Sequence, residues 1–381
     1  MKILYLIHST ANTGAAISFM NMVMGLKNKG IEMAVVGPKP QEDFLDVLSK
    51  HEIPYYSINI AESVYPSILT GGIKDHFLYV LRIVNLIRRK NICYKDILKI
   101  AKIYHPDIIH TNVGTLHEGY RVAKKLHIPH VWHIREYQDK DFGWRFFPSK
   151  AKYEQKLRNS HVIAITKDLI SYFDLNEYGS AHVIYNGIFN KSNRCFIWPK
   201  EKYFLCASRI SWEKGIDEVI AAFANFYRKN KDYRLVVLGD GDSNYIEKLK
   251  GMSKESGCSD AIQWEGYKNN VFEYMKKATC LIVASHHEAF GRMTAEACFA
   301  GCIVLGRNTG GTQEILENTG GFLFETGEDL LRGMVNTSEL LEEDYREIAL
   351  KAQNKAVNTY SIEANIDAVY QTYISITSRS T

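Results

Sequence analysis

A chain of 381 residues is too long for one ordinary hydrophobic core and indicates two domains of roughly 180 residues each. The net charge of +4 comes without a long basic block, so nucleic acid is excluded as the expected partner. The seven cysteines form no C-x-x-C pair, so we expect reduced thiols in a cytoplasmic protein. No run of about 18 apolar residues occurs, so we expect no membrane span.

Short apolar strands alternate with helical segments along the whole sequence. This alternation predicts an α/β protein whose βα units form parallel sheets with right-handed crossovers. The pattern breaks between residues 189 and 202, and helices at about 338–359 and 361–377 end the chain. The expected strands are 3–7, 32–36, 55–58, 107–110, 130–133, 161–165, 182–185, 203–207, 234–238, 262–265, 281–284, 303–306 and 321–324.

Between Lys74 and Lys102 the sequence is apolar and basic at once. Two interpretations remain open for this segment. Its apolar stripe could lie on an anionic membrane, which would suit a lipid-linked substrate, or it could pack into the core beneath a solvated basic face. The stripe would consist of Phe77, Leu78, Val80, Leu81, Val84 and Ile87, and the bases are Arg82, Arg88, Arg89, Lys90, Lys95 and Lys99.

Two residues of the first half lie where expected strands end, and both are candidate ligand contacts. Gly14 precedes a helix after strand 3–7, and a glycine there lets the backbone approach a ligand closely; an ordinary βα turn is the alternative. His133 closes strand 130–133 and can bind a sugar hydroxyl or stabilise developing charge, whereas a hydrogen-bonded core histidine is the alternative. Arg135 and Glu136 either contact an acceptor or pair with each other.

In the second half, Arg209 and Lys214 follow strand 203–207 and precede a helix at residue 216. A forked guanidinium and a point-like ammonium five residues apart can hold a diphosphate from two sides. Two surface bases are the alternative, although a helix N-terminus disfavours cations unless an anion binds there. Asp240-Gly-Asp242 is similar to a metal-binding D-x-D, but we expect Asp242 to cap the next helix and expect no essential metal.

The most informative pattern is Glu288-Ala-Phe-Gly-Arg-Met-Thr-Ala-Glu296, which joins an apolar strand to a helix at 293–300. Ligands of α/β sheets bind at the carboxyl ends of strands, and the free N–H groups of a helix start suit a phosphate. One carboxylate can then contact a sugar and the other a ribose. Acids that merely complement the helix dipole are the alternative.

Together with Gly310-Gly311-Thr-Gln-Glu314, this pattern resembles that of the retaining glycosyltransferases of family 4, the glycosyl transferases of group 1. The resemblance covers nearly the whole chain and implies the GT-B fold, in which two Rossmann-like domains face each other across a cleft. Residues 1–190 would form the acceptor-side domain and residues 191–360 the nucleotide-sugar domain. Residues 361–381 would form a helix that crosses back to the first domain.

The resemblance also implies roles for the candidates, with Glu288 and His133 as catalytic residues at the donor sugar. The expected donor contacts are Gly14 beside the diphosphate, Arg209 and Lys214 on it, backbone at Phe290 and Gly291, Glu296 on the ribose, and backbone near Tyr267 on the base. The sequence departs from the family at Thr13 and Tyr185, which replace a glycine and a proline.

The implied reaction is transfer of a sugar, with retention, from a nucleoside-diphosphate donor to a hydroxyl of a saccharide or lipid-linked saccharide. A UDP-sugar is the first choice of donor, and no cofactor is expected. Cell-surface polysaccharide synthesis, for a capsule or lipopolysaccharide, at the inner face of the membrane is the expected setting. A nucleotide-sugar epimerase of the same fold and a non-catalytic nucleotide-sugar-binding subunit are the alternatives.

Overall fold

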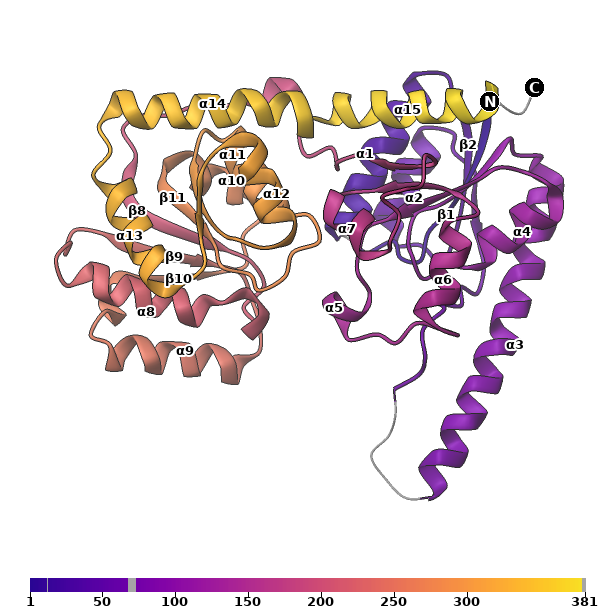
Figure 1. Ribbon diagram of the computed structural model, residues 1–381, viewed down its shortest axis with the longest axis horizontal. Helices are drawn as coiled ribbons and strands as arrows, with labels where there is room; N and C mark the ends of the chain where they lie inside the picture. Colours follow the sequence, from indigo (N-terminus) through magenta and orange to yellow (C-terminus); the bar gives the residue numbers. More distant parts are fainter. Residues whose placement is uncertain (12, 68–72, 379–381) are drawn as a thin grey trace. The chain divides into compact units, whose positions relative to one another are not determined.

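The computed structural model describes residues 1–11, 13–67 and 73–378 and divides the chain into two compact units (Figure 1). Unit 1 comprises Met1–Asn186 with the C-terminal segment from Asn365, and unit 2 comprises Gly187–Ala364. Each unit contains one parallel sheet with helices, and every strand expected from the sequence is present within a few residues of its predicted bounds. The predicted α/β class with two Rossmann-like domains is therefore confirmed.

Unit 1 is built on a seven-stranded sheet in the order β3-β2-β1-β4-β5-β6-β7. Its central strands are buried over their full length, as expected for a parallel sheet covered on both faces. The strands are β1 Lys2–Leu6, β2 Glu32–Gly37, β3 Tyr55–Ser57, β4 Ile108–Thr111, β5 His130–Ile134, β6 His161–Ala164 and β7 Ala181–Val183. The helices are α1 Gly14–Asn28, α2 Glu42–Lys50, α3 Ile73–Tyr104, α4 Glu118–Leu126, α5 Asp139–Phe142, α6 Lys150–Leu157 and α7 Lys167–Tyr172.

The C-terminal helix α15, Ile362–Ser378, contributes to the core of unit 1 from Asn365 onward. Tyr373 is fully buried, and its hydroxyl lies 3.0 Å from that of Tyr5 and 2.6 Å from Nδ1 of His110. A Cβ atom on Gly25 of α1 would overlap the side chain of Ile366 in α15. Because glycine has no side chain at this position, α1 and α15 can approach each other closely. Residues distant in sequence thus complete one core.

Helix α3 is the longest helix of unit 1, and its first turns extend beyond the sheet (Figure 1). Its second half is anchored by buried Cys93, Ile97 and Ala101. In the first half, the interpretation of a core-packed stripe is wrong, because no element among the described residues of unit 1 buries that side of the helix. Six apolar side chains of the predicted stripe are exposed: Phe77, Leu78, Val80, Leu81, Val84 and Ile87.

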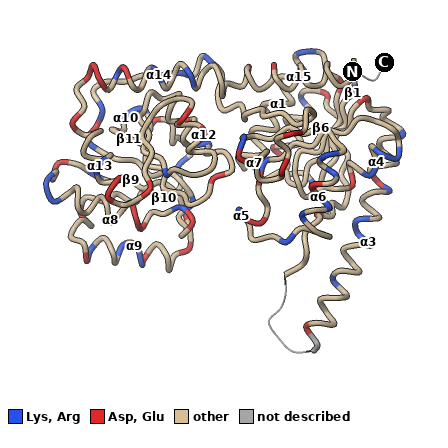
Figure 2. The backbone as a smooth tube through the Cα atoms, in the orientation of Figure 1, with Lys and Arg blue, Asp and Glu red and all other residues tan. Residues whose placement is uncertain are grey.

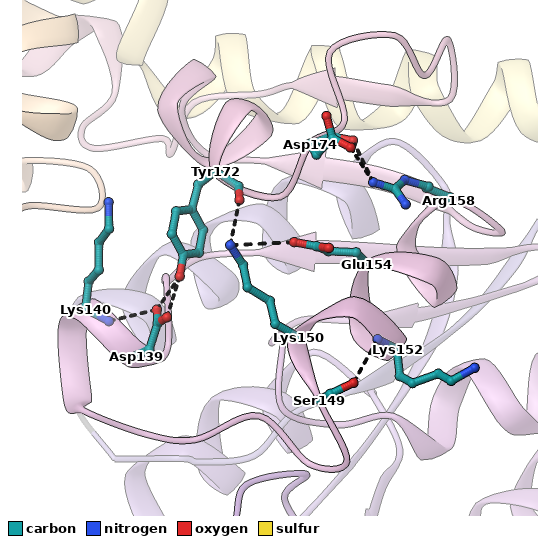
Figure 3. Close-up of polar contacts among 9 residues, drawn as sticks. All are labelled: Asp139, Lys140, Ser149, Lys150, Lys152, Glu154, Arg158, Tyr172 and Asp174. Atoms are coloured by element: carbon teal, nitrogen blue, oxygen red, sulfur yellow. Dashed lines mark hydrogen bonds and ion pairs between the residues drawn. The ribbon is translucent and has the colours of Figure 1, made fainter.

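Polar contacts fix the segment that follows β5 in unit 1 (Figure 3). The hydroxyl of Tyr172 in α7 donates to the carboxylate of Asp139 at the start of α5, at 2.6 Å from Oδ1. Lys150, the first residue of α6, donates to the carbonyl of Tyr172 at 3.0 Å. Arg158 pairs with Asp174 at 2.5 Å. The loop between α5 and α6 is therefore held at both ends.

Unit 2 is built on a six-stranded sheet in the order β10-β9-β8-β11-β12-β13. The helix expected at 338–359 begins later, because Ser338 still belongs to the preceding helix α13. The strands are β8 Glu201–Ala207, β9 Arg234–Leu238, β10 Ile262–Gly266, β11 Ala278–Val283, β12 Ile303–Arg307 and β13 Phe322–Phe324. The helices are α8 Ile216–Tyr227, α9 Ser243–Glu255, α10 Val271–Lys277, α11 Arg292–Phe299, α12 Gly310–Thr319, α13 Gly327–Ser338 and α14 Glu342–Tyr360, with 3-10 turns at Lys191–Asn193, Trp212–Lys214 and Ser259–Ala261.

Candidate active site

A cavity of about 240 Å³ lies in unit 2 at the carboxyl ends of the neighbouring strands β8 and β11. All the strands run parallel, and the order in which successive strands are added to the sheet reverses between β8 and β11, which is where α/β sheets bind ligands. The cavity is smaller than the roughly 300–1,000 Å³ typical of ligand pockets, so it suits a phosphate-sized part of a larger ligand. Its polar lining consists of Ser208, Arg209, Lys214, Ser285, Glu288 and Arg292.

The loop after β8 brings Arg209 and Lys214 to this cavity. Gly215 ends the 3-10 turn and has a φ of 62°, a conformation that favours glycine. A Cβ on Gly215 would lie 2.4 Å from the carbonyl oxygen of Ala284, so only glycine lets this loop meet the loop after β11. The two basic residues that the sequence singled out therefore do face one site.

Lys214 and Glu288 form an ion pair across the cavity. The ammonium lies 2.6 Å from Oε1 of Glu288, and the side chains are 21% and 25% exposed. The Ser285 hydroxyl donates to the same oxygen at 3.1 Å. Since one carboxylate oxygen receives both donors, the Lys214 charge is compensated by Glu288 in the protein alone.

Two glycines of α12 support the backbone that carries Glu288. The N–H of Gly311 donates to the carbonyl of Glu288 at 2.8 Å. A Cβ on Gly311 would lie 2.1 Å from the carbonyl oxygen of Phe290, and one on Gly310 would lie 2.4 Å from that of Glu288. The Gly-Gly pair noticed in the sequence thus permits a backbone-to-backbone contact beneath the loop.

Helix α11 begins after Gly291, whose φ of 83° again favours glycine, and it places Glu296 one turn into the helix. Glu296 is 7% exposed, and burial raises the pKa of its carboxyl group. Arg292 donates from Nε to Oε1 of Glu296 at 2.6 Å. Its Nη1 is buried and meets no acceptor among the described residues, and the Arg292 side chain contributes to the cavity lining.

Arg292 is a cavity residue to which no role was predicted from the sequence. Its position four residues before Glu296 on one helix was the available signal, because side chains at that spacing meet on a helix surface. With Arg209 and Lys214, Arg292 gives the cavity three cationic side chains. Lys214 and Arg292 are paired with Glu288 and Glu296, so among the described residues Arg209 is the one of the three without an ion pair.

A second polar network holds the loop between β11 and α11 from behind. Glu218 of α8 lies 2.7 Å from Nη2 of Arg307 and 3.1 Å from Nε2 of His286. These partners keep the pKa of the Glu218 carboxyl below its usual value despite its partial burial. Arg307 also donates from Nε to the carbonyl of Ala284 at 3.0 Å. These contacts join residues from α8, β11 and β12 and could not be read from local sequence.

Three further predicted positions of unit 2 are placed as follows. Phe290 is 6% exposed, and its ring packs edge-on against that of Tyr360, with 6.0 Å between the ring centres. Its side chain therefore belongs to the packing of unit 2, which leaves its backbone as the part that could contact a ligand. Tyr267 directly follows β10, and its ring is 67% exposed. Asp242 caps α9 by accepting from the N–H of Tyr245 at 3.0 Å, as predicted.

His133 and Gly14 belong to unit 1 and so do not line this cavity of unit 2. His133 is fully buried, and burial together with neighbouring Arg135 holds its pKa well below the usual value, so the ring is neutral. Gly14 is the exposed first residue of α1. Arg135 does not pair with Glu136; its Nε and Nη2 donate to Asn112 at 3.0 and 2.9 Å.

No helix among the described residues combines the length and apolarity that crossing a bilayer requires. In the same residues, no three His, Cys, Asp or Glu side chains come together as a metal site would need.

The chain matches two family models, Glycosyltransferase Family 4 over residues 12–189 and Glycosyl transferases group 1 over residues 190–355. The alpha-monoglucosyldiacylglycerol synthase of Streptococcus pneumoniae is 26% identical over 318 residues, which cover 73% of this chain and 71% of that protein. The synthase of the same name from Acholeplasma laidlawii is 27% identical over 357 residues, or 85% and 84% of the two chains. The crystal structure of Anabaena Alr3699/HepE in complex with UDP has the same fold, with a TM-score of 0.79 at 19% identity, covering 98% of this chain and 100% of that chain.

Proposed function

Because the chain belongs to the group 1 and family 4 glycosyltransferases of GT-B fold, we propose that it transfers a sugar from a UDP-sugar to an acceptor hydroxyl with retention of configuration. The observation that carries the proposal is the cavity of unit 2, where Arg209, Lys214 and Arg292 surround one carboxylate, Glu288. Three cations are far better matched to a diphosphate than to a neutral ligand. UDP is proposed as the leaving group because a neighbour of the same fold was solved with UDP.

The side chains divide the work between leaving group and sugar. Arg209, Lys214 and Arg292 take the diphosphate and stabilise the charge that develops on it as the glycosidic bond breaks. Glu288, on the cavity wall, hydrogen-bonds the donor sugar, and Glu296 holds the ribose. The retained configuration would follow from attack by the acceptor on the face the leaving phosphate departs from, with that phosphate taking the acceptor's proton. His133 and Gly14 are proposed as contacts of unit 1 with donor or acceptor.

The proposed acceptor is lipid-linked, and the proposed setting is the cytoplasmic face of a membrane in the synthesis of a surface glycan. Two relatives are named as synthases of a glycosylated diacylglycerol. The exposed apolar stripe of α3 supports peripheral contact with a bilayer, because bases on the same helix would meet anionic headgroups (Figure 2). Transfer to a soluble saccharide is the other outcome that the assay below can give.

The test is thermal unfolding with UDP, GDP and ADP, each with and without Mg²⁺, followed by transfer assays. A nucleotide at about 100 times its Kd should add about 2.7 kcal/mol of stability. Arg209→Ala should weaken UDP binding, whereas Glu288→Ala should reduce transfer far more than UDP affinity. Turnover of a UDP-sugar without acceptor would indicate an epimerase, and binding without turnover a non-catalytic subunit. Absence of stabilisation by every nucleotide would contradict the transferase assignment of this cavity.

A further inference from the structure

A second and larger cavity, of about 670 Å³, lies within unit 1. It opens where β1, β2 and β3 end, and one side of α3 forms its wall. The carboxyl ends of parallel strands again provide the position at which α/β sheets bind ligands. Aromatic and apolar residues, Tyr65, Trp144 and Leu86 among them, line it beside polar ones.

The charges that line this cavity are mainly positive. Lys39, Arg82 and Arg89 face one carboxylate, that of Glu62. Within the described part of the chain, none of the three bases forms an ion pair, and all three are exposed. Arg89 donates from Nη2 to the carbonyl of Ile60 at 3.0 Å, which fixes its head at the cavity edge and leaves the other N–H groups of the fork for an anion.

Glu62 and His8 make up a second polar wall. The Thr115 hydroxyl donates to Oε1 of Glu62 at 2.9 Å, which leaves the other carboxylate oxygen as an acceptor for a ligand hydroxyl. His8 lines the same cavity directly after β1, and burial lowers its pKa although the nearby Glu62 charge opposes this. A ligand in this cavity would therefore meet cations on one side and hydroxyl-binding groups on the other.

The helical repeat divides the first half of α3 into distinct faces. Residues four apart lie on the same side of a helix. Leu78 is therefore on the side of α3 that carries Arg82 and Leu86 of the cavity wall, one turn before Arg82. Leu78 is 44% exposed and borders the outward apolar patch formed by Phe77, Val80, Leu81, Val84 and Ile87. At about 100° per residue, the cavity side and the apolar patch are centred on nearly opposite sides of the helix, and their edges meet at Leu78 and Leu81.

We propose that this cavity binds the phosphate-bearing headgroup of a membrane lipid that serves as acceptor. Arg82, Arg89 and Lys39 bind the phosphate, Glu62 and His8 bind a hydroxyl, and the hydrocarbon passes over Leu78 to the apolar patch and the bilayer. Charge favours an anionic headgroup over a neutral one, and the adjoining patch favours a lipid over a soluble phosphate ester. The identification as an acceptor rests on the proposed transferase function, whereas the binding of the lipid does not.

The experiment uses the full chain and Trp144, which lines the cavity, as a fluorescence reporter. Monomeric dihexanoyl phosphatidic acid, dihexanoyl phosphatidylcholine and glycerol 3-phosphate are each titrated, with Trp144→Phe assigning the signal. Phosphatidic acid should bind most tightly, and Arg82→Gln/Arg89→Gln should weaken it by roughly a hundredfold, since two charge-assisted hydrogen bonds are lost. Lys124→Gln/Lys125→Gln removes two exposed charges from α4 of the same unit and should leave binding unchanged.

Three outcomes would overturn the proposal. Equal binding of glycerol 3-phosphate would assign the cavity to a soluble phosphate ester. Equal binding of phosphatidylcholine, or equal losses in the two double variants, would show that the bases of α3 do not select the headgroup. UDP binding to each variant is measured in parallel. If UDP binds while phosphatidic acid does not, the lipid site fails alone; if phosphatidic acid binds while UDP does not, the transferase proposal fails alone.

Discussion

Lys214 and Glu288 form an ion pair, so a substitution of either residue should change the affinity for UDP by an amount that depends on the other. We expect Lys214→Met to weaken UDP binding for two reasons. It removes a charge-assisted hydrogen bond to the diphosphate, worth about 1.5–3 kcal/mol. It also leaves Glu288, whose Oε1 lies 2.6 Å from the ammonium, as an unpaired carboxylate on the cavity wall. That carboxylate then repels the incoming phosphate.

The size of the repulsion follows from Coulomb's law. Two unit charges about 5 Å apart repel by about 3 kcal/mol at an effective dielectric constant of about 20. Because the side chains of Lys214 and Glu288 are 21% and 25% exposed, solvent screening reduces this to about 1–2 kcal/mol. Lys214→Met should therefore weaken UDP binding by roughly a hundredfold or more, and adding Glu288→Gln should recover roughly tenfold.

Isothermal titration of UDP into the wild type, the two single variants and the double variant measures this coupling. Glu288→Gln alone should keep or improve UDP affinity while transfer falls, because Lys214 is released from its intramolecular partner. Lys202→Met/Asp232→Asn removes an exposed ion pair of the same unit and should not change UDP affinity. A double variant that binds UDP no better than Lys214→Met would refute the repulsion and with it the placement of the phosphate beside Glu288.

Three further expectations concern stability, the loop support and α3. Burial lowers the pKa of four histidines, so the folded state keeps them neutral while the unfolded chain protonates them near pH 6.5. Stability should therefore fall as the pH drops below 6.5, by on the order of 1 kcal/mol for each histidine at pH 5.5. In urea unfolding, His133→Gln should show a shallower dependence of stability on pH, whereas the exposed control His105→Asn should not. Gly311→Ala should destabilise unit 2 by about 1–3 kcal/mol and reduce transfer, because its Cβ would meet the Phe290 backbone, whereas Gly251→Ala on open α9 should not. Phe77→Ser/Leu81→Ser should lower binding to anionic vesicles with little change in melting temperature, since both side chains are exposed. The buried histidines are His110, His117, His130 and His133.

The fold could be predicted because strand and helix periodicities are local properties of the chain. Buried parallel strands are continuous apolar runs. The short edge strand β13 is also apolar throughout, although Phe324 is its one buried residue, so it too was visible in the sequence. The boundary between α13 and α14 was misplaced because Ser338 and Glu339 carry no strong stop signal and Leu341, the N-cap of α14, has no capping side chain. Periodicity also could not show that the apolar side of the first half of α3 is exposed among the described residues. That depends on how far the sheet and the other helices of unit 1 extend along α3.

The candidate site was predictable in part for a similar reason. Arg209 and Lys214 lie in the connection after β8, and Glu288 lies in the loop after β11; the topology of a parallel sheet brings such connections to one edge. Arg292 and the network of Glu218 with Arg307 were missed, because their importance lies in partners that only the folded chain supplies. Sequence reasoning therefore located the edge of the sheet where the site lies but not the contacts that orient its side chains.

Those contacts explain how a loop can hold a carboxylate at a fixed place. The backbone of Glu288 receives the Gly311 N–H from one side, and its carboxylate receives Lys214 from the other. The start of the same loop is held by Arg307 at the Ala284 carbonyl. In the proposed reaction, a diphosphate that draws Lys214 away removes one of two side-chain anchors of the Glu288 carboxylate and leaves the Ser285 hydroxyl as the other. The two backbone anchors do not depend on charge in the cavity. We therefore expect the Glu288 side chain to turn toward the proposed donor sugar more easily once the phosphate site is occupied, while its backbone stays in place.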